Sequence, residues 1–282
     1  LAGYYTRSDV DTGRVEQVFD ISGAGQFAGM TFTRLLSGRG RYSHEWRASI
    51  EDRLFENDVV FSGLNLCGAA AGALRSCSDV RSRPLTLGYG GSYGTRKLQT
   101  QFHLAYSRNI GVGNHNDALA YARNRAGADV RWDAIRFGAS LEYSLPRGWF
   151  GRVAADGQFS SESLIPGEQF GIGGIGSVRG FEQRQVTGDS GVRGSIELWS
   201  APIRRLAGLR GLVFFDAGWK DMNDPTPAVT DTDLVSSVGF GLRWNWNTQV
   251  SMALDYGIVL DQASSAVERN NNRLHASIMV RY

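Results

Sequence analysis

The sequence has little cysteine, no long hydrophobic run and no excess of charge of one sign. Only 2 of its 282 residues are cysteine, which excludes a disulfide scaffold and a cysteine-based zinc module. No apolar stretch approaches the roughly 18 residues that a helical membrane span needs. Lys and Arg total 30 against 28 Asp and Glu, and this balance gives no electrostatic footprint for a nucleic-acid partner. The hydrophobic share of 42% excludes a disordered chain.

Apolar and polar residues alternate along much of the sequence. Between Val250 and Ile258, the residues Val, Met, Leu, Tyr and Ile alternate with Ser, Ala, Asp and Gly. This period of two predicts β-strands, because successive side chains of a strand point to opposite faces. About thirteen segments show it, and they are roughly nine to eleven residues long, as a tilted strand that crosses a bilayer must be. The clear segments are 98–106, 135–143, 152–159, 192–199, 237–246, 250–258 and 274–282, and the weaker ones are 1–8, 15–21, 27–36, 41–53 and 84–93.

Two all-β architectures fit this alternation: a soluble sandwich with its apolar faces inside, and a membrane barrel with its apolar face in lipid. The polar faces mix Gly, Ser and Gln with charges of both signs, which suits a wet interior, and the apolar faces carry no charge. Aromatic residues also gather at strand ends, where the girdles of a membrane barrel lie. These residues are Trp132, Tyr143, Trp149, Trp219, Trp244, Trp246 and Tyr282.

The connections between the segments decide for the barrel, because long and short ones alternate. The long ones are 55–83, 109–131, 160–190, 220–233 and 261–273, and the short ones are 94–96, 146–148, 201–208 and the turn at Asn247. Outer-membrane barrels have short periplasmic turns and long extracellular loops, whereas a sandwich has no reason to follow that rule. The sequence therefore predicts an antiparallel transmembrane β-barrel over residues 1–282.

The same alternation predicts the topology. The C-terminus should be periplasmic and the long loops extracellular, and counting back places Leu1 at the extracellular end of its strand. Because a closed bacterial barrel has an even number of strands, we expect that this chain lacks the first strands of its barrel and whatever precedes them. The absence of a signal peptide at Leu1 agrees with a mature chain or a fragment.

Two short motifs carry a resemblance to a known family. Val178, Arg179, Gly180 and Phe181, in the Gly-rich loop 160–190, resemble the VRGF/VRGY motif of the sixth loop of the POTRA-transporter superfamily. Phe214, Asp216 and Gly218 resemble the F-x-D-x-G strand motif of that superfamily. The flanking stretches 164–170 and 188–191 are similar to two-partner secretion transporters (TpsB, the haemolysin-activator and filamentous-haemagglutinin transporter family). This resemblance implies about 12 or 13 strands of a barrel of about 16.

The resemblance also implies a pairing inside the barrel. Asp216 shares its strand face with Phe214 and Gly218, which places it in the lumen, and Glu197 lies on the lumenal face of the preceding strand. In the family the loop arginine pairs with the strand aspartate. We therefore expect loop 160–190 to fold inward and Arg179 to pair with Asp216, with Glu197 as a second acceptor. The alternative is that Arg179 remains in water at the loop surface.

The resemblance implies a function in protein export. The family exports one large, unfolded, β-rich exoprotein (TpsA) across the outer membrane of a Gram-negative bacterium, without a nucleotide or other cofactor. In the family, periplasmic POTRA domains recognise this partner, and they would lie upstream of Leu1. Outer-membrane lipid and the barrel-assembly machinery are the other expected partners, and Tyr282 resembles the C-terminal signal that this machinery reads. An aromatic girdle anchor is the simpler role for Tyr282.

Three other functions remain open. A barrel-insertion machine of the same superfamily shares both motifs, and a general porin would have no need of the VRGF loop. An outer-membrane enzyme would need a nucleophile or acid beside a histidine, but His44, His103, His115 and His275 are scattered, so we expect no catalytic residues.

Two further sequence features can be interpreted locally. Gly171, Gly173 and Gly176 match the dinucleotide fingerprint but lack its βαβ context, so they are interpreted as backbone freedom for a folded-in loop. Cys67 and Cys77 fall in one long loop and are expected to form a disulfide in the oxidising compartment, with free thiols as the alternative. No further Cys or His lies nearby, so we expect no metal site.

Overall fold

The computed structural model describes most of the chain. The described residues are 1–8, 13–15, 19–21, 25–38, 40–56, 60–61, 64–65, 79–203, 206, 208–225, 231–261 and 272–281. Cys67, Cys77 and Tyr282 lie outside these residues, so the expected disulfide and the C-terminal signal stay predictions. Within the described ranges, no helix is long and apolar enough to cross a membrane.

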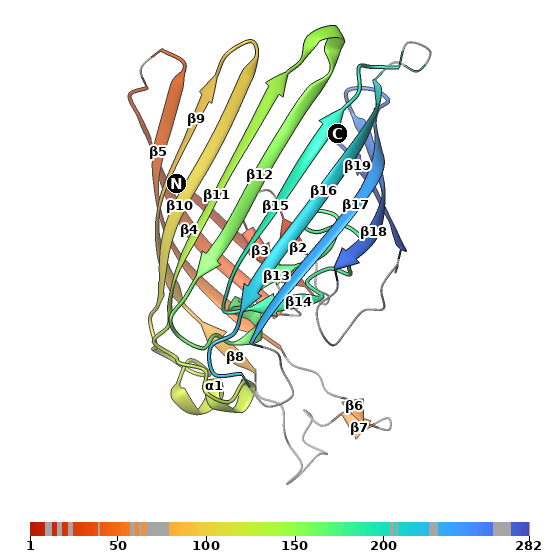
Figure 1. The fold of residues 1–282 in the computed structure, drawn as a ribbon. Helices are drawn as coiled ribbons and strands as arrows, with labels where there is room; N and C mark the ends of the chain where they lie inside the picture. The colour runs from red at the N-terminus through yellow and green to blue at the C-terminus, as the bar shows by residue number, and fades with distance from the viewer. Residues whose placement is uncertain are drawn as a thin grey trace.

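A 13-stranded antiparallel sheet makes up the fold and curves into a barrel wall (Figure 1). Each strand pairs with the next long strand along the chain, and the short strand β8 (Val80–Ser82) pairs with β5. The predicted antiparallel transmembrane barrel is thus confirmed. In order, the long strands are β1 (Ala2–Ser8), β4 (Gly25–Leu36), β5 (Tyr42–Phe55), β9 (Pro84–Gly94), β10 (Leu98–Asn109), β11 (Asp133–Ser144), β12 (Phe150–Phe159), β15 (Ser190–Trp199), β16 (Leu209–Asp221), β17 (Thr232–Asn245), β18 (Val250–Asp261) and β19 (Asn272–Val280).

The wall has an apolar outside and a polar inside. Ile196 on β15 and Phe240 on β17 are 58% and 57% exposed on the outer face, whereas Asp216 on β16 and Asp255 on β18 are fully buried on the inner face. A soluble protein would reverse this arrangement, because it must bury its apolar side chains. The distribution is that of a barrel whose outer face contacts hydrocarbon.

Long and short connections collect at opposite ends of the barrel, as the sequence predicts. The short turns lie at the upper end in Figure 1, and the long connections lie at the lower end with helix α1 (Ala118–Asn124). The loop prediction for 109–131 missed this helix. Its signal is local, since the Asp117 carboxylate caps the helix by accepting hydrogen bonds of 3.0 Å from the backbone N–H groups of Leu119 and Ala120.

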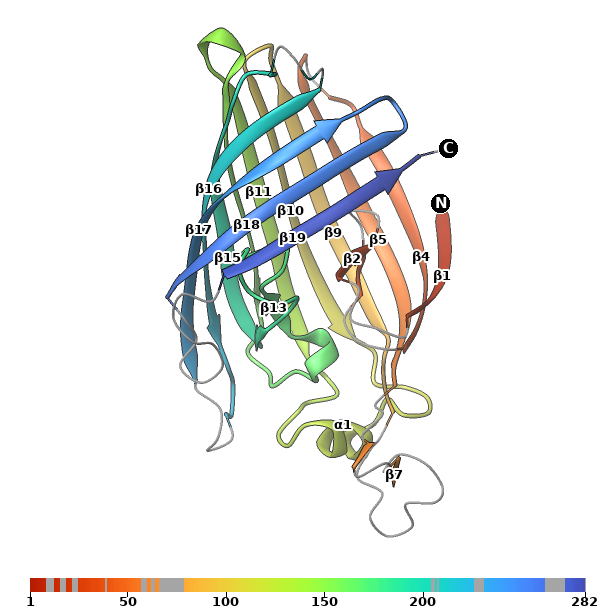
Figure 2. The ribbon, with the colours of Figure 1, turned by 90° about the vertical axis from the view of Figure 1, so that its right-hand side faces the viewer.

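The expected strand at 15–21 is wrong, and with it the expected position of Leu1. β2 (Gly13–Val15) and β3 (Phe19–Ile21) form a separate two-stranded sheet, while β4 pairs directly with β1. Strands of three residues are far below the roughly nine that a span requires, so this hairpin belongs to a connection. The twelve long strands then alternate in direction so that both termini lie at the short-turn end (Figure 2).

Candidate functional site in the barrel lumen

The connection between β12 and β15 folds back into the barrel (Figure 2). It contains a short 3-10 turn (Pro166–Glu168) and a hairpin of β13 (Phe170–Ile172) and β14 (Val186–Gly188). Its apolar side chains form a small core with two inward-facing valines of the wall, Val235 and Val259. The other members of that core are Ile172, Val178, Phe181 and Val186, and all six are at most 5% exposed. The loop is therefore packed as part of the fold rather than lying over it.

The guanidinium of Arg179, at the tip of this loop, is held by carboxylates of two neighbouring strands. Its Nε and Nη2 atoms donate hydrogen bonds of 2.7 Å to the two carboxylate oxygens of Asp216. Nη2 also lies 2.8 Å from Glu197 Oε1 and 3.0 Å from the hydroxyl of Ser195. Arg179 is 3% exposed and Asp216 is fully buried. A planar guanidinium with several fixed donors suits such a site better than an ammonium group would.

Three further contacts seat the tip. The backbone N–H of Arg179 donates a 3.0 Å hydrogen bond to Asp216 Oδ2, and the guanidinium carbon lies 3.5 Å from the centre of the Phe214 ring. Asp255 on β18 lies 3.8 Å from Arg179 Nη1. It also forms a bidentate ion pair with Arg243, in which both hydrogen bonds are 2.8 Å long. The arginine is thus surrounded by three carboxylates from three strands.

This surrounding charge keeps Arg179 protonated. Burial alone disfavours the charged guanidinium, but the hydrogen bond to Asp216 and the charges of Asp216, Glu197 and Asp255 outweigh it and raise the pKa of Arg179. The guanidinium of Arg179 therefore keeps its positive charge inside the lumen. An ion cluster of this kind is costly to break, because each partner would leave an unpaired buried charge behind.

Glycines let the tip approach the wall closely. Gly180 has φ +98°, a left-handed conformation that favours glycine. A Cβ at Gly257 on β18 would lie 2.6 Å from the backbone nitrogen of Gly180, and one at Gly218 would lie 2.7 Å from Ile172 Cγ2. Gly218 belongs to the predicted strand motif, whereas Gly257 belongs to no predicted motif. Both positions admit the loop only because they carry no side chain.

The base of the loop is fixed by a second buried carboxylate, Glu168. Its side chain is fully buried and lies 2.7 Å from Arg53 Nη1 on β5 and 3.3 Å from Arg136 Nη2 on β11. It also accepts a hydrogen bond from the hydroxyl of Ser82. The wall strands on both sides of the loop are thereby joined through one loop residue.

A third carboxylate, Asp189, joins three connections at the long-loop end. One oxygen accepts hydrogen bonds from Arg125 Nη1 at 2.5 Å, from Leu164 N at 2.9 Å and from Gln169 Nε2 at 3.3 Å. The other accepts from Arg125 Nη2 at 2.9 Å and from Asn223 N at 2.8 Å. Arg125 follows helix α1, and Asn223 lies between β16 and β17. Asp189, which is fully buried, therefore ties the inward loop to two other long connections.

Replacing Asp189 with Asn is expected to loosen all three connections. An amide cannot offer two anionic oxygens, and breaking a buried ion pair costs about 3–5 kcal/mol. Amide hydrogen exchange in peptides spanning 160–168 and 219–225 should accelerate by roughly two orders of magnitude or more. The matched control is Asp156→Asn, which breaks a 2.9 Å pair with Arg193 that is 28% exposed at the carboxylate and should cost about 0–1 kcal/mol. Equal exchange in the two variants would contradict the role assigned to Asp189.

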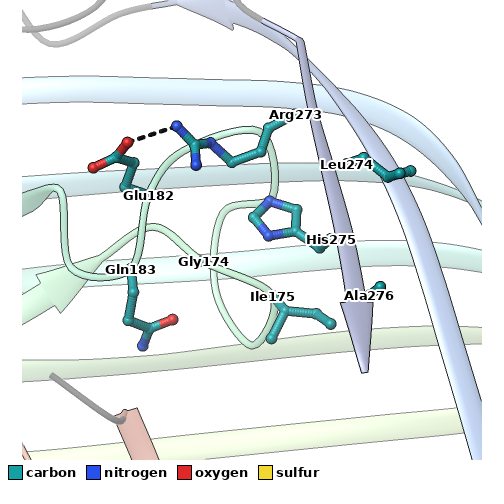
Figure 3. A pocket seen from close by; sticks show the side chains of 8 residues that line it. All are labelled: Gly174, Ile175, Glu182, Gln183, Arg273, Leu274, His275 and Ala276. Carbon is teal, nitrogen blue, oxygen red and sulfur yellow. Dashed lines mark hydrogen bonds and ion pairs between the residues drawn. The ribbon is translucent and has the colours of Figure 1, made fainter. Parts of the chain in front are cut away.

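A pocket of about 480 Å³ lies between the loop tip and β19 (Figure 3). On one side are the loop residues Gly174, Ile175, Glu182 and Gln183, and on the other are residues 273–276 of β19. An ion pair of 2.7 Å between Arg273 and Glu182 crosses it. Both faces of β19 contribute to the lining, so the pocket follows the side of this strand that faces away from β18.

The structure brings together the residues that the sequence selected and adds several that it missed. Arg179, Asp216 and Glu197 meet as described, while Val178 and Phe181 are buried in the loop core and Phe214 lies under the guanidinium. The missed residues are Ser195, Glu168, Asp189, Asp255, Gly257 and His275. For Asp255, the alternation of residues in its strand indicated only that the side chain faces the lumen. Nothing in the sequence indicated that it contacts the loop. In the described part of the chain, no group of three or more His, Cys, Asp or Glu side chains could hold a metal ion.

Comparisons with known proteins agree with this architecture. The model of the family "Haemolysin secretion/activation protein ShlB/FhaC/HecB" matches residues 76–244, more than half of the chain. No curated protein sequence matches the chain.

Solved structures show the same fold at low sequence identity. CdiB from Escherichia coli matches with a TM-score of 0.70 and 16% identity over 99% of this chain and 48% of its own. CdiB from Acinetobacter baumannii matches with a TM-score of 0.66 and 18% identity over 99% of this chain and 46% of its own. BamA from Haemophilus ducreyi lacking POTRA domains 1-3 matches with a TM-score of 0.60 and 12% identity, over 92% of this chain and 55% of its own. The chain thus spans about half the length of the solved structures that it matches.

Proposed function

Because the chain belongs to the haemolysin secretion/activation protein ShlB/FhaC/HecB family, we propose that it exports a large, unfolded, β-rich exoprotein of the TpsA type through its barrel. The protein is a TpsB-type outer-membrane β-barrel of a Gram-negative bacterium. Its apolar outer face contacts lipid, and its long connections face the outside, following the rule for outer-membrane barrels. The barrel-assembly machinery inserts it into the membrane.

The observation that carries this proposal is the seated loop. A polar lumen alone would suit any porin, but here a loop of about thirty residues is packed into it and held by the Arg179 cluster. A loop that only narrowed a pore would need no buried ion pairs to three strands. The seated tip supports a transporter that holds one defined conformation until the exported chain engages it.

The chemistry of the lumen agrees with transport of an extended polypeptide. The inner wall carries cross-strand pairs of opposite charge, among them Arg193 with Asp156 at 2.9 Å and Arg243 with Asp255 at 2.8 Å. Paired charges hydrate the wall without attracting a chain of one sign. The periplasm supplies no nucleotide, so the free energy of transport comes from folding of the exported protein outside.

A barrel-insertion activity is the second candidate, because BamA shares the fold. The two CdiB structures match with higher TM-scores than BamA does, and the family model is that of the secretion proteins. Both points favour export. A general porin is the third candidate and would show solute flux that does not depend on the loop.

The test replaces residues 177–181 with five Gly and Ser residues in the complete protein. Under the proposal, export of the co-expressed exoprotein falls at least about tenfold, since the ion cluster and the loop core are both lost, while the barrel still migrates as a folded species on unheated gels. Export at the wild-type level would contradict the proposal. A parallel fall in the amounts of unrelated outer-membrane proteins would favour the insertion activity.

A further inference from the structure

His275, on the last described strand, contacts the backbone of the loop tip. It lies on the inner face of β19, between the exposed outward residues Leu274 and Ala276 (Figure 3). Its Nε2 atom accepts a 3.1 Å hydrogen bond from the backbone N–H of Gly180, the residue after Arg179. Arg179 attaches the tip to β15 and β16 by ion pairs. β19 holds the loop through this neutral contact and through the ion pair of Arg273 with Glu182.

This contact has a protonation requirement. An imidazole nitrogen accepts a hydrogen bond only when it carries no proton, so His275 must be neutral with its proton on Nδ1. Protonation turns Nε2 into a donor that faces another donor, the N–H of Gly180. The hydrogen bond is then lost and replaced by repulsion.

Charged side chains of β19, β18, β16 and the inward loop surround His275. On β19, Arg273 lies two residues away on the same face and pairs with Glu182 of the loop. On β18, Asp255 stands directly opposite His275 in the register and is shared by Arg243 and Arg179. Asp216 on β16 completes the cluster. An imidazolium would therefore find a carboxylate at Asp255 and no acceptor at Gly180.

We propose that His275 is a positioning residue for the loop tip, and that acidification protonates it and thereby breaks the hydrogen bond that holds Gly180 to β19. The ion pairs of Arg179 and that of Arg273 with Glu182 do not involve the imidazole, so the tip loses one anchor and keeps the others. The loop tip becomes more mobile on acidification without disassembly of the site. That this movement regulates export rests on the proposed function, whereas the movement of the tip itself does not.

Exposure of Val178 reports the position of the tip. Val178 is fully buried beside Arg179, so a Val178→Cys thiol reacts with a maleimide only when the tip leaves the wall. The experiment uses the complete protein in liposomes, with Cys67 and Cys77 replaced by Ser. Because thiol reactivity itself depends on pH, the measured quantity is the labelling rate relative to the same protein carrying His275→Gln, whose amide oxygen accepts a hydrogen bond and does not titrate.

The expected ratio is near one at pH 7.5 and rises about five- to tenfold at acidic pH, once the imidazole takes up a proton. His275→Leu, which has no acceptor, should label fast at both pH values. A ratio that does not change with pH, or equal labelling of the Gln and Leu variants, would overturn the inference.

Export is measured separately, in proteins that keep Val178. Acid should reduce export in the wild type and leave the His275→Gln variant unchanged if the tip regulates transport. Loss of the proposed export function would appear as no export at any pH, and the labelling result would stand independently of it. Gel mobility of unheated samples confirms that every variant has a folded barrel.

Discussion

Replacing Arg179 with Ala is expected to release the loop tip from the barrel wall and to abolish export, while the barrel still forms. The substitution leaves Asp216, Glu197 and Asp255 without the cation that they share. Breaking a buried pair by removing one partner costs about 3–5 kcal/mol, because the remaining charge stays buried and unpaired. The barrel wall keeps its hydrogen-bonded strands, so the loss should be confined to the loop. Secretion of the exoprotein and protease sensitivity of the loop measure the two effects.

A second arginine provides the matched control. Arg152 Nη1 lies 3.6 Å from the same Glu197, but its side chain is 39% exposed. Arg152→Ala should therefore cost about 0–1 kcal/mol and leave export near the wild-type level. A similar loss in both variants would show that lumenal positive charge as such matters, rather than the seated tip.

A double-variant experiment can show whether Arg179 and Asp216 act as a pair or contribute to export independently of each other. If the residues act as a pair, the loss in the Arg179→Ala, Asp216→Ala double variant should be close to that of either single variant. Exchanging the charges, with Arg179→Asp and Asp216→Arg together, should restore part of the export. Restoration cannot be complete, because the backbone N–H of Arg179 also donates to the Asp216 carboxylate. Additive losses without any restoration would contradict the pairing.

Replacing Gly257 with Ala is expected to have an effect of comparable size from a single methyl group. The new Cβ would lie 2.6 Å from the nitrogen of Gly180 and 2.8 Å from the carbonyl carbon of Arg179. Both are backbone atoms and cannot rotate away as a flexible side chain would. The tip must therefore move off β18, which breaks the Gly180 contact with His275 and strains the Arg179 cluster. Overpacking of this kind costs about 1–3 kcal/mol or more, and export should fall accordingly.

Gly90→Ala is the control for this change. Gly90 lies on the inner face of β9, where a Cβ would meet its nearest neighbour, the carbonyl oxygen of Phe102, at 3.5 Å, an ordinary van der Waals distance. The same chemical change in the lumen should leave export and loop protection unaltered. If Gly257→Ala behaved like Gly90→Ala, the working state would not have its loop tip against β18.

The strands of the barrel wall could be predicted because each one is indicated by the alternation of its own residues. Alternation in 98–106 and 250–258 corresponds to β10 and β18 closely, since the side-chain direction in a strand follows from its own backbone. Segment 15–21 shows the limit of that argument: it alternates, yet only short strands of a separate hairpin form there. Alternation indicates an extended backbone, whereas spanning also requires length and a neighbour to pair with.

The connections were predicted less well, for a different reason. Helix α1 lies in a segment assigned to a loop, although Asp117 carries a recognisable capping signal. The interior position of loop 160–190 came from its resemblance to a family rather than from its residues. Its glycines permit many conformations, and the conformation that forms depends on Val235 and Val259, which lie far along the chain in other strands.

By itself, the sequence determined which face of each strand is apolar, the antiparallel barrel that follows from it and the two motifs that meet in the lumen. Only the tertiary structure decided that Asp255, Gly257 and His275, on the last two strands, close around a tip that precedes them by 76 to 95 residues. The reason is geometric: a strand specifies the direction of its own side chains, but the path of a loop through the lumen sets which strands it reaches.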